Sequence, residues 1–198
     1  MANKNKQFNI AIVGTGGQGL ITILKIISQA ALIEGKDIKT SELHGLSQRG
    51  GSVEIHIRFG KEIFSPLVKQ GNADLIIALE AQEALKACYY ASKQTKTIFL
   101  VNDFFVPIPG KKLLTKNNIL KNLRNFSQQI ILVPASALCK KQVGTSVTAG
   151  VFLISLACFK NLIPLKPNSI LRAIEKVIPE KYLELNKKTW ILAKTKNL

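Results

Sequence analysis

Phe8-Asn9-Ile10-Ala11-Ile12-Val13-Gly14-Thr15-Gly16-Gly17-Gln18-Gly19 joins a short apolar run to a glycine-rich turn. The run is apolar, partly β-branched and stops at glycine, which is typical of a buried strand. Apolar residues then recur at helical spacing, at Leu20, Ile23, Leu24, Ile27, Ala30 and Ala31. This order of strand, glycine turn and helix predicts the first unit of a Rossmann-like fold.

The rest of the chain continues to alternate between strands and helices. Strands are expected at residues 38–41, 74–79, 97–101 and 129–133. Helices are expected at residues 80–91, 115–125, 135–141, 147–159, 169–177 and 181–193. Such alternation predicts a Rossmann-like three-layer α/β/α fold with a mainly parallel sheet and extra C-terminal helices. No linker interrupts the pattern, so residues 1–198 are expected to form a single domain.

Residues 52–59 differ from the other strands because apolar and polar side chains alternate along them. The apolar face comprises Val53, Ile55, Ile57 and Phe59. A strand with one polar face is typical of an edge or half-exposed position, which predicts a solvated or partner-facing His56. A tight turn is expected next, with residues 62–65 as a hairpin partner.

Composition and charge argue against several classes of protein. The chain has 198 residues, of which 46% are hydrophobic and 20% are charged, as in globular domains. Its net charge is +16, but the lysines are spread along the chain without interleaved aromatic residues, which disfavours nucleic-acid binding. No apolar run approaches the ~20 residues of a membrane span, and no signal peptide precedes the first strand. We therefore expect a cytoplasmic protein with neither nucleic-acid nor membrane partners.

The three cysteines, Cys88, Cys139 and Cys158, are odd in number and far apart in sequence. This spacing suits neither a disulfide framework nor a four-thiolate metal site. We expect reduced cysteines that pack as small apolar side chains, and no metal bound by this chain.

The glycine turn fits a nucleotide-binding pattern. Gly14, Gly16 and Gly19 match G-x-G-x-x-G, whose backbone amides and following helix N-terminus can hold a phosphate. Glu42 follows in the position of an acid that binds ribose hydroxyls. This pattern predicts a free-standing NAD(P)- or flavin-binding oxidoreductase or nucleotide sensor, unless the glycines only permit close packing of strand and helix. Gly17 and Gln18 are not required for binding a pyrophosphate, which counts against an ordinary dehydrogenase.

A second polar stretch follows the strand expected at residues 38–41. It reads Ser41-Glu42-Leu43-His44-Gly45-Leu46-Ser47-Gln48-Arg49-Gly50-Gly51-Ser52. Its glycines allow the backbone to approach a ligand, and Gln48 and Arg49 supply hydrogen-bond donors. The stretch is either a recognition loop or a surface loop with turn glycines.

Together, Gly14-Thr15-Gly16-Gly17-Gln18-Gly19 and the stretch from Ser41 to Val53 resemble the gamma-type domain of the 2-oxoacid:ferredoxin oxidoreductases, the pyruvate/ketoisovalerate oxidoreductase family. Within that family they are most similar to the small (beta) subunits that act on indolepyruvate. Those subunits carry G-x-G-G-Q-G after the first strand and then S-E-x-H-G-M-S-Q-R-G-G-S-V. The present sequence has Leu46 in place of the usual Met. It also has Ala149 in place of an amide side chain and Ala193 in place of glycine.

The resemblance implies a Rossmann-like fold and a reaction. The reaction is oxidative decarboxylation of a 2-oxoacid, here indolepyruvate or another aryl pyruvate, to an acyl-CoA and CO2, with reduction of ferredoxin. Thiamine diphosphate, Mg2+ and 4Fe–4S clusters are expected in a large alpha subunit, and CoA is the co-substrate. The isolated chain is expected to bind none of these cofactors by itself and to be inactive without that partner.

The two loops are expected to meet at the carboxyl ends of neighbouring strands, the usual ligand position in open α/β sheets. Arg49 is the main catalytic candidate, paired with a substrate carboxylate or a CoA phosphate, with Glu42 and His44 positioning it or handling protons. Alternatively, Arg49 only caps a carbonyl within its own loop, or the loops serve assembly alone. The residues expected to contact ligand or partner are Gly14, Gly16, Gly17, Gln18, Gly19, Ser47, Gln48, Gly50 and Gly51.

Overall fold

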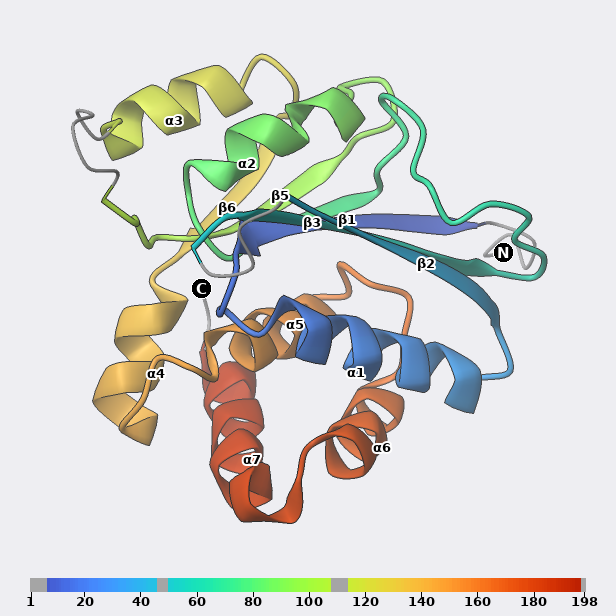
Figure 1. The fold of residues 1–198 in the computed structure, drawn as a ribbon, viewed down its shortest axis with the longest axis vertical. Helices are drawn as coiled ribbons and strands as arrows, with labels where there is room; N and C mark the ends of the chain where they lie inside the picture. The colour runs from blue at the N-terminus through green and yellow to red at the C-terminus, as the bar shows by residue number, and fades with distance from the viewer. Residues whose placement is uncertain (1–6, 46–49, 108–113, 197–198) are drawn as a thin grey trace.

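The computed structural model describes residues 7–45, 50–107 and 114–196, which form a mixed α/β fold on a six-stranded sheet (Figure 1). The strands lie in the order β2-β3-β1-β4-β5-β6. They are β1 (Phe8–Thr15), β2 (Asp37–His44), β3 (Ser52–Gly60), β4 (Leu75–Ala78), β5 (Ile98–Asn102) and β6 (Gln129–Val133). β1, β4, β5 and β6 pair in parallel, whereas β3 runs antiparallel to both β1 and β2.

Helices cover both faces of the sheet (Figure 1). One face is covered by α1 (Leu20–Ile33) and α5 (Ala149–Phe159), with α6 (Pro167–Val177) and α7 (Glu180–Thr195) packed beyond them and α4 (Ala135–Val143) beside α5. The other face is covered by α2 (Glu83–Lys86), the 3-10 helix η1 (Ala87–Tyr90) and α3 (Lys116–Leu123). The predicted fold class, with its parallel sheet and extra C-terminal helices, is confirmed.

The central strands are apolar throughout because both of their faces are buried. In β1, Ile10 and Ile12 pack into the core beneath α1 and α5, whereas Ala11 and Val13 pack into the smaller core beneath α2 and α3. α5 is buried along almost its whole length, since it lies between the sheet and the outer helices α6 and α7. Its apolar sequence therefore reflects a helix packed on all sides.

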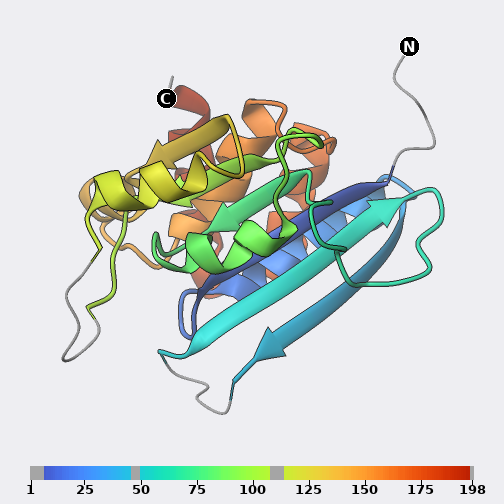
Figure 2. The same ribbon diagram turned by 90° about the horizontal axis from the view of Figure 1, so that it is seen from above.

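The expectation that residues 52–59 form an edge strand is wrong. β3 lies between β2 and β1, and β2 forms this edge of the sheet, opposite the edge formed by β6 (Figure 2). The four apolar residues of β3 do face the core, but His56 on the opposite face is only 1% exposed. Its burial arises because the segment after β3 folds back over this face, and the Val68 amide donates to His56 Nδ1 at 3.2 Å. Residues 62–65, expected to be a hairpin partner, contain no strand.

A partly buried hydrogen-bond network replaces the expected solvated face. Because His56 Nδ1 accepts from Val68, its Nε2 carries the proton and donates to Glu54 Oε1 at 2.9 Å. The Tyr90 hydroxyl donates to the same oxygen at 2.7 Å. The bond from His56, against the opposing effect of burial and with help from Tyr90, holds the pKa of the Glu54 carboxyl below its usual value of 4.5. Burial and this carboxylate raise the pKa of Tyr90.

Replacing Glu54 by glutamine should destabilise the protein by about 1–2 kcal/mol at neutral pH, because a charged acceptor of two hydrogen bonds is lost. The effect should depend on pH. A carboxyl whose pKa is lowered on folding contributes its stability above the unfolded value of 4.5 and loses it as pH falls through the lower folded pKa. The melting temperature of the native protein should therefore fall more steeply below pH 4.5 than that of Glu54→Gln. If the melting temperatures of the native protein and of Glu54→Gln fell equally steeply with pH, the role of the Glu54 carboxylate in this network would be contradicted.

The described part of the chain contains no helix long and apolar enough to cross a membrane.

Candidate functional site

The candidate site lies at the edge of the sheet where β1, β2 and β4 end. β1 and β4 are parallel, and β2 runs in the direction of β1 because both are antiparallel to β3. The segments after these strands therefore emerge at one edge, the usual ligand position in open α/β sheets. They are the glycine turn (residues 14–19), the described ends of the hairpin loop (residue 45 and residues 50–51) and the start of the β4–α2 connection (residues 79–82).

Backbone hydrogen bonds join the glycine turn directly to the hairpin loop. The Gly16 amide donates to the Gly51 carbonyl at 2.8 Å, and the Gly50 amide donates to the Gly16 carbonyl at 3.2 Å. Gly16 of the first glycine motif and Gly50 and Gly51 of the second, more than 30 residues apart in the sequence, thus lie side by side. They do not follow neighbouring strands as expected, since β3 lies between β1 and β2 and carries the hairpin that brings the loops together.

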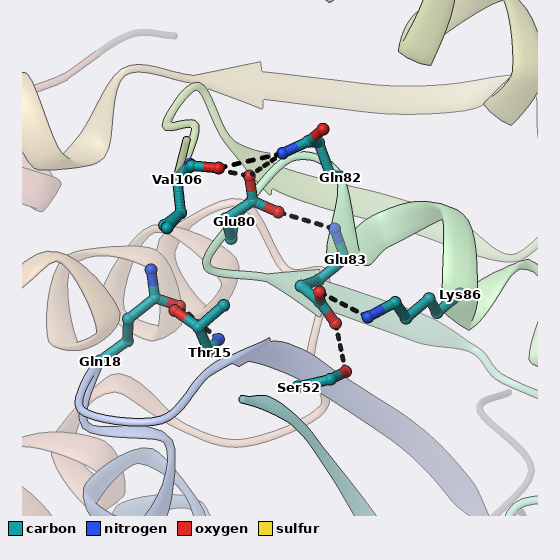
Figure 3. Close-up of polar contacts among 8 residues, drawn as sticks. All are labelled: Thr15, Gln18, Ser52, Glu80, Gln82, Glu83, Lys86 and Val106. Carbon is teal, nitrogen blue, oxygen red and sulfur yellow. Dashed lines mark hydrogen bonds and ion pairs between the residues drawn. The ribbon is translucent and has the colours of Figure 1, made fainter. Parts of the chain in front are cut away.

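The side chain of Gln18 folds back and stabilises the glycine turn (Figure 3). The side-chain Oε1 of Gln18 accepts from the Thr15 amide at 2.8 Å, and the backbone amide of Gln18 donates to the Thr15 carbonyl at 3.2 Å. A Cβ on Gly14 would lie 2.6 Å from that Oε1, so Gly14 leaves the space that Gln18 fills. Gly17 has φ +99°, which only glycine adopts easily. These contacts explain the two residues that a nucleotide motif does not require.

Replacing Gly14 by alanine should destabilise the protein by about 1–2 kcal/mol, because the added methyl group expels the Gln18 amide and leaves the Thr15 amide without that acceptor. Gln18→Ala is the matched control, since it removes the same hydrogen bond without a collision. The double variant should be less destabilised than the sum of the single variants, because no amide remains to be expelled. Additive losses in urea unfolding would show that Gly14 and Gln18 act independently.

Glu42 and His44 lie near the carboxyl end of β2 and are exposed. They share an open cavity of about 450 Å³ with the glycine turn, lined by Gly16, Gly17, Gly19, Leu20, Ile21, Glu42, His44 and Val53. The structure thus places both predicted polar side chains beside the turn. Ser47, Gln48 and Arg49 lie outside the described residues, as does Leu46.

Two buried glutamates, Glu80 and Glu83, which were not predicted as site residues, complete this edge of the sheet (Figure 3). Glu80, only 2% exposed, accepts from the amides of Glu83 at 2.8 Å and Val106 at 3.1 Å. Glu83 accepts from the Ser52 hydroxyl and pairs with Lys86 at 2.7 Å. The pair therefore connects the ends of β4 and β5 with the start of β3. Only Glu80 could have been found from the sequence, because it directly follows the strand expected at residues 74–79.

The three cysteines pack as expected. Cys88 belongs to the core beneath α2 and α3, whereas Cys139 and Cys158 belong to the core on the other face of the sheet. Burial raises the pKa of the Cys88 and Cys158 thiols to about 11, so they are protonated at neutral pH. Within the described ranges, no three His, Cys, Asp or Glu side chains gather in a way that could hold a metal ion.

Comparisons with known proteins agree with this architecture. The family model for pyruvate ferredoxin/flavodoxin oxidoreductase matches residues 9–194. The chain is 34% identical over 185 residues to the indolepyruvate oxidoreductase subunit IorB of Archaeoglobus fulgidus, covering 92% of this chain and 91% of that one. It is 30% identical over 192 residues to the subunit of the same name from Thermococcus kodakarensis, covering 94% of each.

Solved structures show the same fold. The gamma subunit of the keto/oxoacid ferredoxin oxidoreductase from Geobacter sulfurreducens superimposes with a TM-score of 0.68 at 21% identity. The match covers 94% of this chain and 96% of that subunit.

Proposed function

The chain belongs to the pyruvate ferredoxin/flavodoxin oxidoreductase family, and we propose that it is the small subunit of a 2-oxoacid:ferredoxin oxidoreductase acting on indolepyruvate or another aryl pyruvate. The observation that carries this proposal is the match at 34% identity with an indolepyruvate oxidoreductase subunit along 92% of this chain. The joined glycine turn and hairpin loop support it, because the motifs that resemble this family form one surface.

The proposed reaction converts a 2-oxoacid and CoA into an acyl-CoA and CO2 and passes electrons to ferredoxin. A large alpha subunit would hold thiamine diphosphate, Mg2+ and 4Fe–4S clusters. The residues of this chain do not fit a cluster, because its three thiols are buried on two opposite faces of the sheet and a cluster takes four thiolates. The chemistry of decarboxylation and electron transfer would therefore take place on the partner.

The contribution of this chain would come from the joined loops. Arg49 would pair with a carboxylate or phosphate of the substrates through two parallel hydrogen bonds. Glu42 and His44, exposed at the end of β2, would position that arginine or move a proton. The backbone of Gly50 and Gly51, fixed to Gly16, would hold the hairpin loop in a defined place against the large subunit.

A free-standing nucleotide-binding oxidoreductase is the second candidate, and the geometry of the glycine turn counts against it. The amides of Thr15, Gly16 and Gln18 are bonded within the protein instead of being available to a phosphate. The antiparallel strand β3 also separates Glu42 from β1 by one strand more than in a dinucleotide-binding unit. Saturable NAD(P) or flavin binding by the isolated chain in calorimetry would favour this second candidate.

Affinity purification of the tagged chain from its native source tests the proposal. A large subunit that contains thiamine diphosphate and iron should co-purify, and the complex should reduce ferredoxin with indolepyruvate and CoA. Recovery of the chain without such a subunit would overturn the proposal. Recovery of a complex that turns over only pyruvate or 2-oxoglutarate would keep the family and correct the substrate.

A further inference from the structure

Acidic residues are missing from one long part of the chain. Residues 104–174 contain ten lysines and arginines and no acidic residue, whereas the whole chain has 28 basic and 12 acidic residues. This part includes α3, β6 and α4. β6 forms one side of the sheet, and α3 and α4 lie on opposite faces of the sheet beside it (Figure 1). We call these three elements the β6 edge, and none of them contains an acidic residue.

β6 is an edge strand with apolar side chains. Among the described strands it pairs with β5 alone. Ile130, Ile131 and Leu132 are only partly buried, although helices cover both faces of the sheet. The outer side of an edge strand presents backbone donors and acceptors with which a further strand can pair. β6 therefore offers an added strand both backbone hydrogen bonds and apolar contacts.

Basic side chains flank β6 before and after it in the chain. Lys121 and Arg124 lie at the end of α3, and Lys140 and Lys141 lie in the last turn of α4. All four side chains are exposed. The ion pairs found between described residues include none of them. The β6 edge therefore carries four cations whose charge is not neutralised by a carboxylate of the described chain.

This charge decides which kind of strand suits the β6 edge. A second copy of the chain, paired through its own β6, would bring the same cations against them, and like charges at an interface cost free energy. An acidic segment would instead bring carboxylates to these cations. The β6 edge thus disfavours pairing with itself and favours a partner of opposite charge.

We propose that the β6 edge binds an extended acidic segment of a partner protein, which pairs with β6 as a further strand and places carboxylates near Lys121, Arg124, Lys140 and Lys141. Hydrogen bonds to the β6 backbone would supply affinity, and the carboxylates would supply specificity. β4 and β5 separate β6 from β1, which leads into the glycine turn. The surface is therefore distinct from the joined loops and from their proposed contribution to the large subunit.

Fluorescence anisotropy with the full-length chain tests the proposal. The probe is a labelled peptide in which pairs of valine alternate with pairs of glutamate, so that both faces of an extended strand carry carboxylates. It should bind saturably and more weakly as salt is raised, because exposed charges are screened. The same peptide with lysine in place of glutamate should not bind. A form with N-methylated amides keeps its charge but cannot pair as a strand, so it should bind at least about ten-fold more weakly.

Two variants of equal net charge test the position of the site. The first reverses the four cations of the β6 edge (Lys121→Glu, Arg124→Glu, Lys140→Glu and Lys141→Glu) and should weaken peptide binding at least about ten-fold. The matched control reverses four exposed lysines elsewhere in the chain (Lys25→Glu, Lys61→Glu, Lys69→Glu and Lys93→Glu) and should weaken binding less than about two-fold. Both variants should keep the native melting temperature, because every substituted side chain is exposed.

Several outcomes would overturn the proposal. Equal weakening by the two variants would show that the peptide responds only to net charge, and equal binding of the N-methylated peptide would exclude strand addition. Tighter binding of single-stranded DNA of the same charge would assign the edge to nucleic acid. A dimer in size-exclusion chromatography that excludes the peptide would assign it to a second copy. No peptide binding at millimolar concentration would leave the cations only the role of preventing aggregation. These results do not depend on the large subunit or on enzyme activity.

Discussion

Replacing Arg49 by alanine should lower ferredoxin reduction by the reconstituted enzyme about 100-fold, while the chain should still assemble with its large subunit. The expected loss is large because a guanidinium that pairs with a carboxylate or phosphate supplies a charge and two hydrogen bonds at once. Assembly should persist because the hairpin loop is joined to the glycine turn through backbone atoms of Gly16, Gly50 and Gly51. The measurement is turnover at saturating indolepyruvate and CoA, with assembly followed by size-exclusion chromatography.

Arg49→Lys is the matched variant for this prediction. It keeps the charge but loses the planar fork, so it should recover only part of the activity. Unchanged turnover and unchanged assembly in Arg49→Ala would remove the proposed role. Loss of assembly with normal turnover in the complexes that still form would instead assign the loop to subunit contact alone.

Replacing Glu80 by alanine is expected to have the largest effect on stability, about 3 kcal/mol. The substitution removes a buried acceptor and leaves the amides of Glu83 and Val106 without it. The ends of β4 and β5 would then lose a shared contact beside the candidate site. The free energy of unfolding, measured in urea, should fall with little change in the slope against denaturant.

Glu80→Gln is the control, because its amide oxygen can still accept from both backbone amides. The free energy of unfolding should therefore fall less than half as far in Glu80→Gln as in Glu80→Ala. Equal losses in the two variants would show that the negative charge matters more than the acceptor geometry. If the free energy of unfolding of Glu80→Ala fell by less than about 1 kcal/mol, Glu80 would not stabilise the ends of β4 and β5 as proposed.

The sequence was sufficient for the order and type of most elements, because that order depends on local periodicity. The strand that leads into Gly14 and the helix after Gly19 both follow from nearby residues. The family resemblance predicted that the two glycine motifs act together, and the hydrogen bonds of Gly16 agree with that expectation.

The features that the sequence did not reveal depend on contacts between distant segments. The alternation in β3 resembled an exposed strand because the segment that buries His56 follows it without any pattern of its own. Glu80 and Val106 are 26 residues apart and meet only after β4 and β5 have paired.

Titration of this chain into its separately purified large subunit tests the central claim most directly. Ferredoxin reduction with indolepyruvate and CoA should be low without the chain, should rise with each addition and should level off once the large subunit is saturated. Gly14→Ala, which disturbs the turn beneath the joined loops, should require more protein to reach the same plateau. Full activity of the large subunit without this chain, or no response to its addition, would contradict the claim that the chain is the small subunit of this enzyme.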